Sequence, residues 1–259
     1  MQEEKTIATQ ARFKVLGINV DAVQIPDVIA RIEEWIAERK SCHFIVVTGM
    51  HGVIEAQRDP FFKQLLNSAD LVVPDGAPLV WLGRKAGYAL KRRVYGPELM
   101  EIFCKSTGKK YRHFLYGGTD DTLERLKDVL EKRYGLNIAG AYSPPFRPLS
   151  PEEGAKEIDL INQANPDVIW VSLGEPKQSR WMYEHVHSLQ APVMVGVGAA
   201  FDFLPGIKPQ APRWMREHGL EWLFRLSTEP KRLWKRYLIG GPKFIYYVIL
   251  ERLKIRKFD

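Results

Sequence analysis

The sequence of 259 residues has only two cysteines and no long apolar run, and each shortage excludes a class of protein. Cys42 and Cys104 cannot build a disulfide framework, and both lie in apolar surroundings, so we expect buried thiols in a reducing compartment. No stretch approaches the roughly 18 apolar residues of a membrane-spanning helix. The N-terminal segment "MQEEKTIATQARFKVLG" lacks the apolar core of a signal peptide. Together these shortages predict a cytoplasmic protein.

Motifs for metal binding and serine hydrolysis are missing too. The six histidines are scattered, and His185 and His187 do not share one helix face. There is no paired-cysteine motif, no His-Glu-x-x-His, no Asp-x-Asp after a strand and no Gly-x-Ser-x-Gly elbow. We therefore expect no metal ion and no other cofactor.

Positive charge is concentrated at one end of the chain. Residues 207–259 hold thirteen Lys/Arg against five Asp/Glu, a net charge of +8, whereas residues 1–206 have a net charge of −1. Such a field favours a polyanionic partner, either nucleic acid or an anionic membrane surface.

Short β-rich runs alternate with helical patterns through the first two hundred residues. Several runs, such as "FIVVT" and "VIWVS", are apolar throughout, which is typical of strands buried on both faces of a parallel sheet. The expected strands are Phe13–Val20, His43–Thr48, Leu71–Pro74, Arg112–Tyr116, Asn137–Ala141, Val168–Ser172 and Val193–Gly196.

Helical spacing of apolar residues predicts helices over Ile25–Arg39, Thr119–Arg133 and Pro151–Ala164, the last with Ser150 as N-cap. The alternation indicates a Rossmann-like α/β fold with a mostly parallel sheet flanked by helices. After Gly206 the pattern changes to short, proline-punctuated helices with aromatics among basic residues. We therefore divide the chain into a catalytic domain, residues 1–206, and a basic helical appendage, residues 207–259.

Five expected strands are followed by polar or glycine-rich segments, where open α/β sheets bind ligands. A plain turn explains each of these segments alone equally well. Lys177 and Gln178 suit a phosphate or a sugar hydroxyl at a helix start, and Arg92-Arg93 precedes the Gly96-Pro97 turn. The five segments are Thr48–Gly52, Pro74-Asp75-Gly76, Gly117-Gly118-Thr119, Gly174–Gln178 and Gly196–Gly198.

Taken together and in order, these segments resemble the WecG/TagA/CpsF glycosyltransferase family. The resemblance covers most of the chain. It rests on "VTGMHGVIEAQRDPFFKQLLNSADLVVPDGAPLVW", "RRVYGPELM", "FLYGGTDDT", "LGEPKQSRW", "GVGAAFDFLPG", "APRWMREHGLEWLFRL" and "EPKRLWKRYL".

The resemblance implies an inverting enzyme that forms a β-linkage without a metal. It would move a sugar from a UDP-sugar to a polyprenyl-diphosphate-linked saccharide, in the synthesis of a cell-surface polysaccharide or a teichoic acid linkage unit. It would work as a peripheral protein on the inner face of the plasma membrane, and the resemblance leaves room for a homo-oligomer. By position, Asp75 would be the general base, Arg93 would steady the diphosphate leaving group, and Gln178 would contact the donor or the transition state.

Further site residues follow from the same blocks. Gly49 and Ser179 depart from the residues that many family members carry; "PKQE" reads "PKQS" here, with Ser179 replacing an acid. The expected substrate-binding residues are Thr48, Gly49, His51, Gly76, Gly96, Gly117, Gly118, Gly174, Lys177, Gly198 and Asp202. The expected membrane- or acceptor-binding residues are Arg213, Arg216, Arg225, Arg232, Lys235 and Arg236.

Two other functions compete with this interpretation. A basic α/β protein with interleaved aromatics could bind single-stranded nucleic acid, although this does not explain the polar strand ends. A nucleotide-dependent oxidoreductase could use the glycine-rich turns, but the Gly-x-Gly-x-x-Gly pattern is incomplete. The interpretation that we carry forward has UDP-sugar, a lipid-linked acceptor and an anionic membrane as partners, and no nucleic acid.

Overall fold

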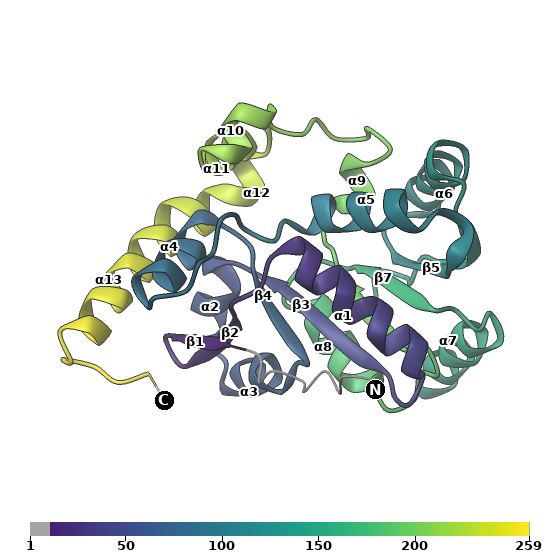
Figure 1. Ribbon diagram of the computed structural model, residues 1–259, viewed down its shortest axis with the longest axis horizontal. Coiled ribbons are helices and arrows are strands. Elements are labelled where there is room, and N and C mark those ends of the chain that lie inside the picture. The colour runs from purple at the N-terminus through teal and green to yellow at the C-terminus, as the bar shows by residue number, and fades with distance from the viewer. Residues whose placement is uncertain (1–10, 259) are drawn as a thin grey trace, which may run out of the picture.

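The computed structural model describes residues 11–258 and contains a six-stranded parallel sheet with helices on both faces (Figure 1). The strands lie in the order β4-β3-β8-β7-β5-β6. This architecture confirms the predicted Rossmann-like α/β class. The strand bounds are β3 (His43–Thr48), β4 (Leu71–Pro74), β5 (Arg112–Gly117), β6 (Asn137–Tyr142), β7 (Val168–Ser172) and β8 (Val193–Gly196).

The predicted strand Phe13–Val20 was wrong. The chain forms an antiparallel hairpin there, β1 (Arg12–Val15) and β2 (Ile18–Asp21), apart from the main sheet. Its turn places Leu16 and Gly17 at φ values of +51° and +77°. A leucine rarely takes a left-handed backbone, so Gly17 by itself was too weak a signal to predict a two-residue turn. Complete burial of the Leu16 side chain offsets the strain.

The predicted helices are confirmed to within one residue at each end. Ser150 caps its helix by accepting from the Glu153 N–H, and Thr119 caps another by accepting from the Thr122 N–H. The helices of the first 206 residues are α1 (Ile25–Glu38), α2 (Met50–Ala56), α3 (Pro60–Ser68), α4 (Ala77–Lys85), α5 (Gly96–Thr107), the 3₁₀ turn η1 (Gly108–Lys110), α6 (Asp120–Tyr134), α7 (Pro151–Gln163), α8 (Lys177–His185) and α9 (Ala200–Phe203).

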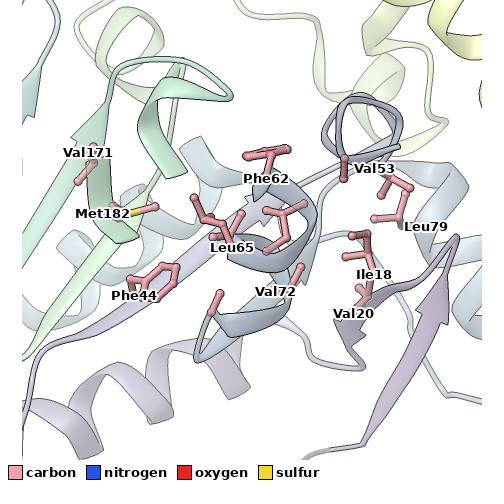
Figure 2. Close-up of a cluster of buried hydrophobic side chains, with 14 of the residues drawn as sticks. Ile18, Val20, Phe44, Val53, Phe62, Leu65, Val72, Leu79, Val171 and Met182 are labelled. Carbon is pink, nitrogen blue, oxygen red and sulfur yellow. The ribbon is translucent and has the colours of Figure 1, made fainter. Parts of the chain in front are cut away.

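Two apolar clusters, one on each face of the sheet, form the core. Along β3, Phe44 and Val46 enter one cluster and Ile45 enters the other, as the two-residue period of a strand requires. Figure 2 shows the first cluster, in which Phe62 and Leu65 of α3 lie over the sheet. Burying each such side chain contributes about 1.5–3 kcal/mol, so the strand ends are held on a rigid platform.

The two thiols differ in burial. Cys104 is fully buried, and burial raises the pKa of its thiol well above the ordinary value. Cys42 is half-buried, and burial raises the pKa of its thiol to about 12. The expectation of a buried thiol is confirmed for Cys104 and only partly for Cys42; both stay protonated at neutral pH.

The appendage is helical, as predicted, and no strand occurs between residues 207 and 258. Its last helix, α13, packs against α2 and lies alongside α4 (Figure 1), and its buried Phe244 and Val248 join the first core cluster. None of the helices described between residues 11 and 258 has the length and apolar character needed to cross a bilayer. The elements are α10 (Arg213–Glu217), α11 (Glu221–Thr228), α12 (Pro230–Trp234), the π-helical turn η2 (Lys235–Ile239) and α13 (Gly240–Arg252).

Candidate active site

A cleft of about 610 Å³ opens beyond the carboxyl ends of β3 and β4. We call it the Asp75 cleft. The core contributes α4, residues 91–93 and part of α5 to its walls, and the appendage contributes α10, α11 and η2. The lining includes nine of the predicted site residues: Gly49, His51, Asp75, Gly76, Arg93, Arg213, Arg216, Arg225 and Arg236.

Asp75 lies in the turn that joins β4 to α4. Its backbone N–H donates to the carbonyl of Thr48 over 2.8 Å, which ties the turn to the end of β3. Gly76 follows at a φ of +117°, which L side chains rarely adopt, so this position requires glycine. A Cβ on Gly49 would lie 2.3 Å from the carbonyl oxygen of Asp75. Two glycines therefore let β3, β4 and α4 meet closely enough to fix this carboxylate.

Arg93 joins the core to the appendage. Its Nη1 lies 3.3 Å from Asp75 Oδ1, and its Nη2 forms an ion pair with Glu221 at the start of α11. The guanidinium also lies over the Tyr95 ring, 4.2 Å from the centroid. The Asp75, Arg93 and Glu221 side chains thus form one linked charge cluster, in which a single guanidinium serves two carboxylates.

The Asp75 carboxyl has a raised pKa, chiefly because burial disfavours its charged form. Arg93 opposes this effect, Glu221 adds to it, and Arg236 and Arg225 oppose it further. The side chain keeps 29% of its surface exposed, so a substrate can reach it. A carboxylate with a raised pKa holds a proton more strongly than an exposed aspartate, as a general base requires.

Arg216, Arg225 and Arg236 supply the cationic wall of the Asp75 cleft. All three come from the appendage, and the Nε of each is buried with no hydrogen-bond partner within residues 11–258. Guanidinium N–H groups can only donate, so these buried donors call for an acceptor that the protein does not supply. Burial also lowers the pKa of Arg236 from its ordinary value. The wall is suited to an anionic ligand such as a diphosphate.

Thr48 ends β3, and His51 lies in the first turn of α2. His51 lines the cleft, and burial lowers the pKa of its imidazole to about 4, helped by Arg236 and Arg58, so the ring is neutral at pH 7. Thr48 is buried behind the lining, under Gly52, whose Cβ would lie 2.1 Å from the Thr48 hydroxyl oxygen. His51 can therefore touch a ligand directly, whereas Thr48 supports the wall.

Gln178 lies at the start of α8 and is only 2% exposed. Its Nε2 donates to Glu175 over 3.3 Å, and its Oε1 accepts from the Gly198 N–H over 3.1 Å. Ser179, the departure from the family pattern, donates to the same Glu175 oxygen over 2.7 Å. Both ends of the Gln178 amide are thus engaged within the protein. Its contact with the donor or the transition state stays a prediction.

Glu175 is a functional candidate that the sequence did not single out. Its second carboxylate oxygen is buried without a partner in the described part of the chain. Burial raises the pKa of Glu175, and Ser179, Arg236 and Gln178 oppose this effect. The net result is a pKa of about 7. Ser179, which replaces the acid of the family pattern, is therefore hydrogen-bonded to another carboxylate, that of Glu175, four residues earlier in the chain.

The glycine-rich turn after β5 is explained by packing. A Cβ on Gly117 would lie 2.2 Å from the Ser172 carbonyl, and Gly118 donates its N–H to that carbonyl over 3.2 Å. That N–H is therefore not free for a diphosphate in this conformation. Gly96 similarly lies against the backbone of Val197, where a Cβ would be 2.9 Å from the carbonyl oxygen. Their place in the substrate site stays a prediction.

The remaining predicted residues do not line the Asp75 cleft. Asp202 pairs with Lys208 over 2.6 Å, Arg232 pairs with Glu229, and Lys235 lies 5.6 Å from the Trp234 ring centroid. The predicted residues outside the lining are Thr48, Gly96, Gly117, Gly118, Gly174, Lys177, Gln178, Gly198, Asp202, Arg232 and Lys235.

Sequence reasoning missed several residues of the cleft, most clearly Glu221, which lies in a strongly basic segment and has only 8% of its side chain exposed. The presence of Glu221 among so many basic residues was the only sequence signal that it pairs with one of them. The aromatic residues Trp81, Trp222 and Tyr237 also line the cleft. Among residues 11–258, no three His, Cys, Asp or Glu side chains are grouped so as to hold a metal ion.

The arrangement suits a displacement reaction with an anionic leaving group. A carboxylate with a raised pKa can take a proton from an attacking hydroxyl, while Arg93 and the cationic wall stabilise negative charge that develops nearby. The appendage supplies Glu221 and the wall arginines, so the site is complete only with both parts of the chain.

Comparison with known proteins agrees with this chemistry. Residues 13–258 match the profile of the glycosyl transferase WecG/TagA/CpsF family. Relatives from Staphylococcus aureus strains NCTC 8325 / PS 47, COL and MRSA252 are 28% identical over 249 residues, which covers 95% of this chain and 96% of each relative. Each is named N-acetylglucosaminyldiphosphoundecaprenol N-acetyl-beta-D-mannosaminyltransferase.

Proposed function

The chain belongs to the WecG/TagA/CpsF glycosyltransferase family, and from this premise we propose that it moves a sugar from a UDP-sugar to a polyprenyl-diphosphate-linked saccharide. The observation that carries the proposal is the Asp75–Arg93–Glu221 cluster beside three unpartnered arginine Nε groups. A base and an anion-binding wall in one cleft are what such a transfer needs.

The acceptor that we propose is N-acetylglucosaminyl diphosphoundecaprenol, which the relatives' name specifies for those proteins. The same name makes N-acetylmannosamine the first donor sugar to test. Neutral His51 and the cleft-lining Glu98 and Glu101 offer hydrogen-bonding groups for sugar hydroxyls. The product would enter a cell-surface polysaccharide or a teichoic acid linkage unit.

In the proposed reaction an acceptor hydroxyl oxygen attacks the anomeric carbon from the face opposite UDP. The new carbon–oxygen bond forms as the bond to the β-phosphate oxygen breaks, and UDP leaves with that electron pair. Asp75 takes the hydroxyl proton. One displacement inverts the anomeric centre, so an α-linked donor gives a β-linked product.

Charge on the departing UDP is the main electrostatic demand of this step. We assign its stabilisation to Arg93, Arg225 and Arg236, which surround Asp75 closely enough to influence its pKa. Three guanidinium groups take the part that a divalent ion has in other transferases, so the proposed reaction needs no metal.

Peripheral attachment to an anionic membrane is also part of the proposal. The outward side of α13, together with its C-cap residue Leu253, carries an apolar stripe, which we define as Ile245, Tyr246, Ile249 and Leu253. Ile245 is 60% and Leu253 64% exposed. Phe244 and Val248 on the opposite side are buried, so α13 is apolar on two faces. Basic residues of the appendage would attract anionic lipid around this stripe.

The nucleic-acid alternative is less well supported. Arg216, Arg225 and Arg236 point into a cleft that also holds Asp75 and Glu221, whose carboxylates would repel a nucleic acid backbone. An oxidoreductase is also disfavoured, because the Gly118 N–H that could bind a dinucleotide is already bonded to Ser172.

The test is UDP release from a panel of UDP-sugars offered with the lipid-linked acceptor, in the presence and absence of EDTA. We expect turnover with at least one donor and no loss with EDTA. Asp75→Asn should lower kcat by about 100- to 10,000-fold and leave UDP binding and thermal stability near wild type. Near-normal turnover of Asp75→Asn would exclude it as the base, and absence of turnover with every donor would reject the proposed reaction.

A further inference from the structure

Trp81 of α4 belongs both to the Asp75 cleft and to the outer surface. Its side chain lines the cleft and is 50% exposed, although α4 is part of the core rather than the appendage. The Trp81 indole is thus half exposed to solvent at the mouth of the cleft. An apolar ligand that covered it would gain binding free energy by removing apolar surface from water.

Two cations hold the Trp81 ring from different parts of the chain. Lys85, one turn later on α4, places Nζ 5.6 Å from the ring centroid, and Arg252 of α13 places Cζ at 5.0 Å. Arg252 precedes Leu253 and lies one helical turn after Ile249, both members of the apolar stripe. The cleft mouth therefore continues into the apolar stripe of α13 by way of Trp81.

A lipid-linked acceptor carries three groups in series: a sugar, a diphosphate and an apolar chain. The reacting hydroxyl must meet Asp75, and the diphosphate should meet arginines. Trp81 lies four residues after Ala77, the first residue of α4, which places it about 6 Å farther along the helix axis. Whatever is attached to the diphosphate must leave the cleft at its mouth, past an apolar wall.

We propose that Trp81 and the apolar stripe of α13 form a subsite for the first isoprene units of the acceptor's polyprenyl chain. This inference rests on the proposed function, which supplies a lipid-linked acceptor. The subsite would draw the chain out of the cleft onto the face of α13, with Lys85 and Arg252 fixing the indole as its wall. It would thereby select acceptors by their lipid and place the lipid-facing surface partly on the catalytic domain.

The test uses two acceptors, N-acetylglucosaminyl diphosphate carrying either an undecaprenyl chain or a methyl group, both assayed in detergent micelles. The quantity measured is the ratio of kcat/KM for the long-chain acceptor to that for the methyl acceptor. Trp81→Ala should lower this ratio about tenfold, through KM for the long-chain acceptor, because the indole's apolar area is lost to the chain. Ile249→Ser should lower the ratio in the same direction, and Trp81→Leu, which keeps an apolar wall, should stay within about twofold of wild type.

The matched control is Phe146→Ala, which removes an exposed aromatic (92% exposed) that does not line the Asp75 cleft and should leave the ratio unchanged. A photoreactive isoprenoid chain on the acceptor should label residues 77–85 or 245–253, which tests the subsite without turnover. Equal losses for both acceptors would instead place a sugar against Trp81 and overturn the chain subsite. An unchanged ratio with lost vesicle binding would assign the surface to bulk lipid and overturn it as well. Wild-type protein that uses neither acceptor rejects the proposed function, and the subsite with it.

Discussion

Arg93 and Glu221 are separated by 128 positions in the chain and form an ion pair at the Asp75 cleft. Arg93 precedes α5 in the core, and Glu221 begins α11 in the appendage. The same guanidinium reaches Asp75, so the appendage acts on the proposed base through one intermediate side chain. Truncation of one carboxylate should therefore be felt by the other.

We expect Glu221→Gln to weaken catalysis without unfolding the protein. The Glu221 charge raises the pKa of Asp75, so its removal should lower that pKa and make Asp75 a weaker base. kcat/KM should fall about tenfold, and the acidic limb of the pH–rate profile should move to lower pH. Glu124→Gln, an exposed acid of α6, is the control. A rate loss with an unmoved acidic limb would show that Glu221 acts only by holding the appendage in place.

Arg236→Gln should lower kcat/KM for the UDP-sugar by about 10- to 100-fold, because a buried guanidinium of the cationic wall is lost. Arg236→Lys should recover only part of this, since an ammonium lacks the planar fork. Lys231→Gln removes an exposed appendage cation outside the Asp75 cleft and should stay within about twofold of wild type. Equal effects of the two glutamine variants would mean that appendage charge acts only over long range.

Glu175 should make stability depend on pH in an unusual direction. Its pKa is raised to about 7, so between about pH 4.5 and 7 the folded protein keeps a proton that the unfolded chain has lost. The free energy of unfolding contributed by this group therefore falls as pH rises through that window. Glu175→Gln should gain stability relative to wild type between pH 5 and pH 8, by at most about 3 kcal/mol.

Urea unfolding at both pH values measures the Glu175 effect, with Glu184→Gln, an exposed acid of α8, as the control. Parallel pH dependences for Glu175→Gln and wild type would contradict a proton held at Glu175.

His51 should give the free energy of unfolding the opposite dependence on pH. Its pKa is lowered to about 4, so His51→Gln should lessen the loss of stability as pH falls from about 6.5 to 4.

The sheet could be predicted because each of its strands has a recognisable local sequence pattern. Val168–Ser172 and Val193–Gly196 are apolar runs, and the structure has strands over those very residues. The hairpin at Leu16 could not, since a buried leucine in a left-handed turn is fixed by the core and not by its neighbours in sequence. Local pattern fails where distant packing decides the backbone.

The candidate site divides in the same way. Asp75 and Arg93 followed from strand ends and turns, and the structure brings them within 3.3 Å. Glu221 and Trp81 could not be found so, because their roles depend on how α11 and α13 lie against α4 and α5. The boundary at Gly206 stays a prediction. Phe244 beyond it is buried in the first core cluster, so the appendage is anchored in the core.

The π-helical turn η2 fixes how two surfaces of the appendage are rotated relative to each other about the helix axis. It carries Arg236 and Tyr237 into the Asp75 cleft and passes directly into α13, whose apolar stripe faces outward. A π turn holds one residue more than an α turn, and one residue rotates everything beyond it by about 100°. Deleting a single residue within η2 would therefore turn either the arginine away from the cleft or the stripe toward the core. The extra residue of η2 thus fixes the rotation of the anion-binding wall relative to the lipid-facing side along one continuous helix.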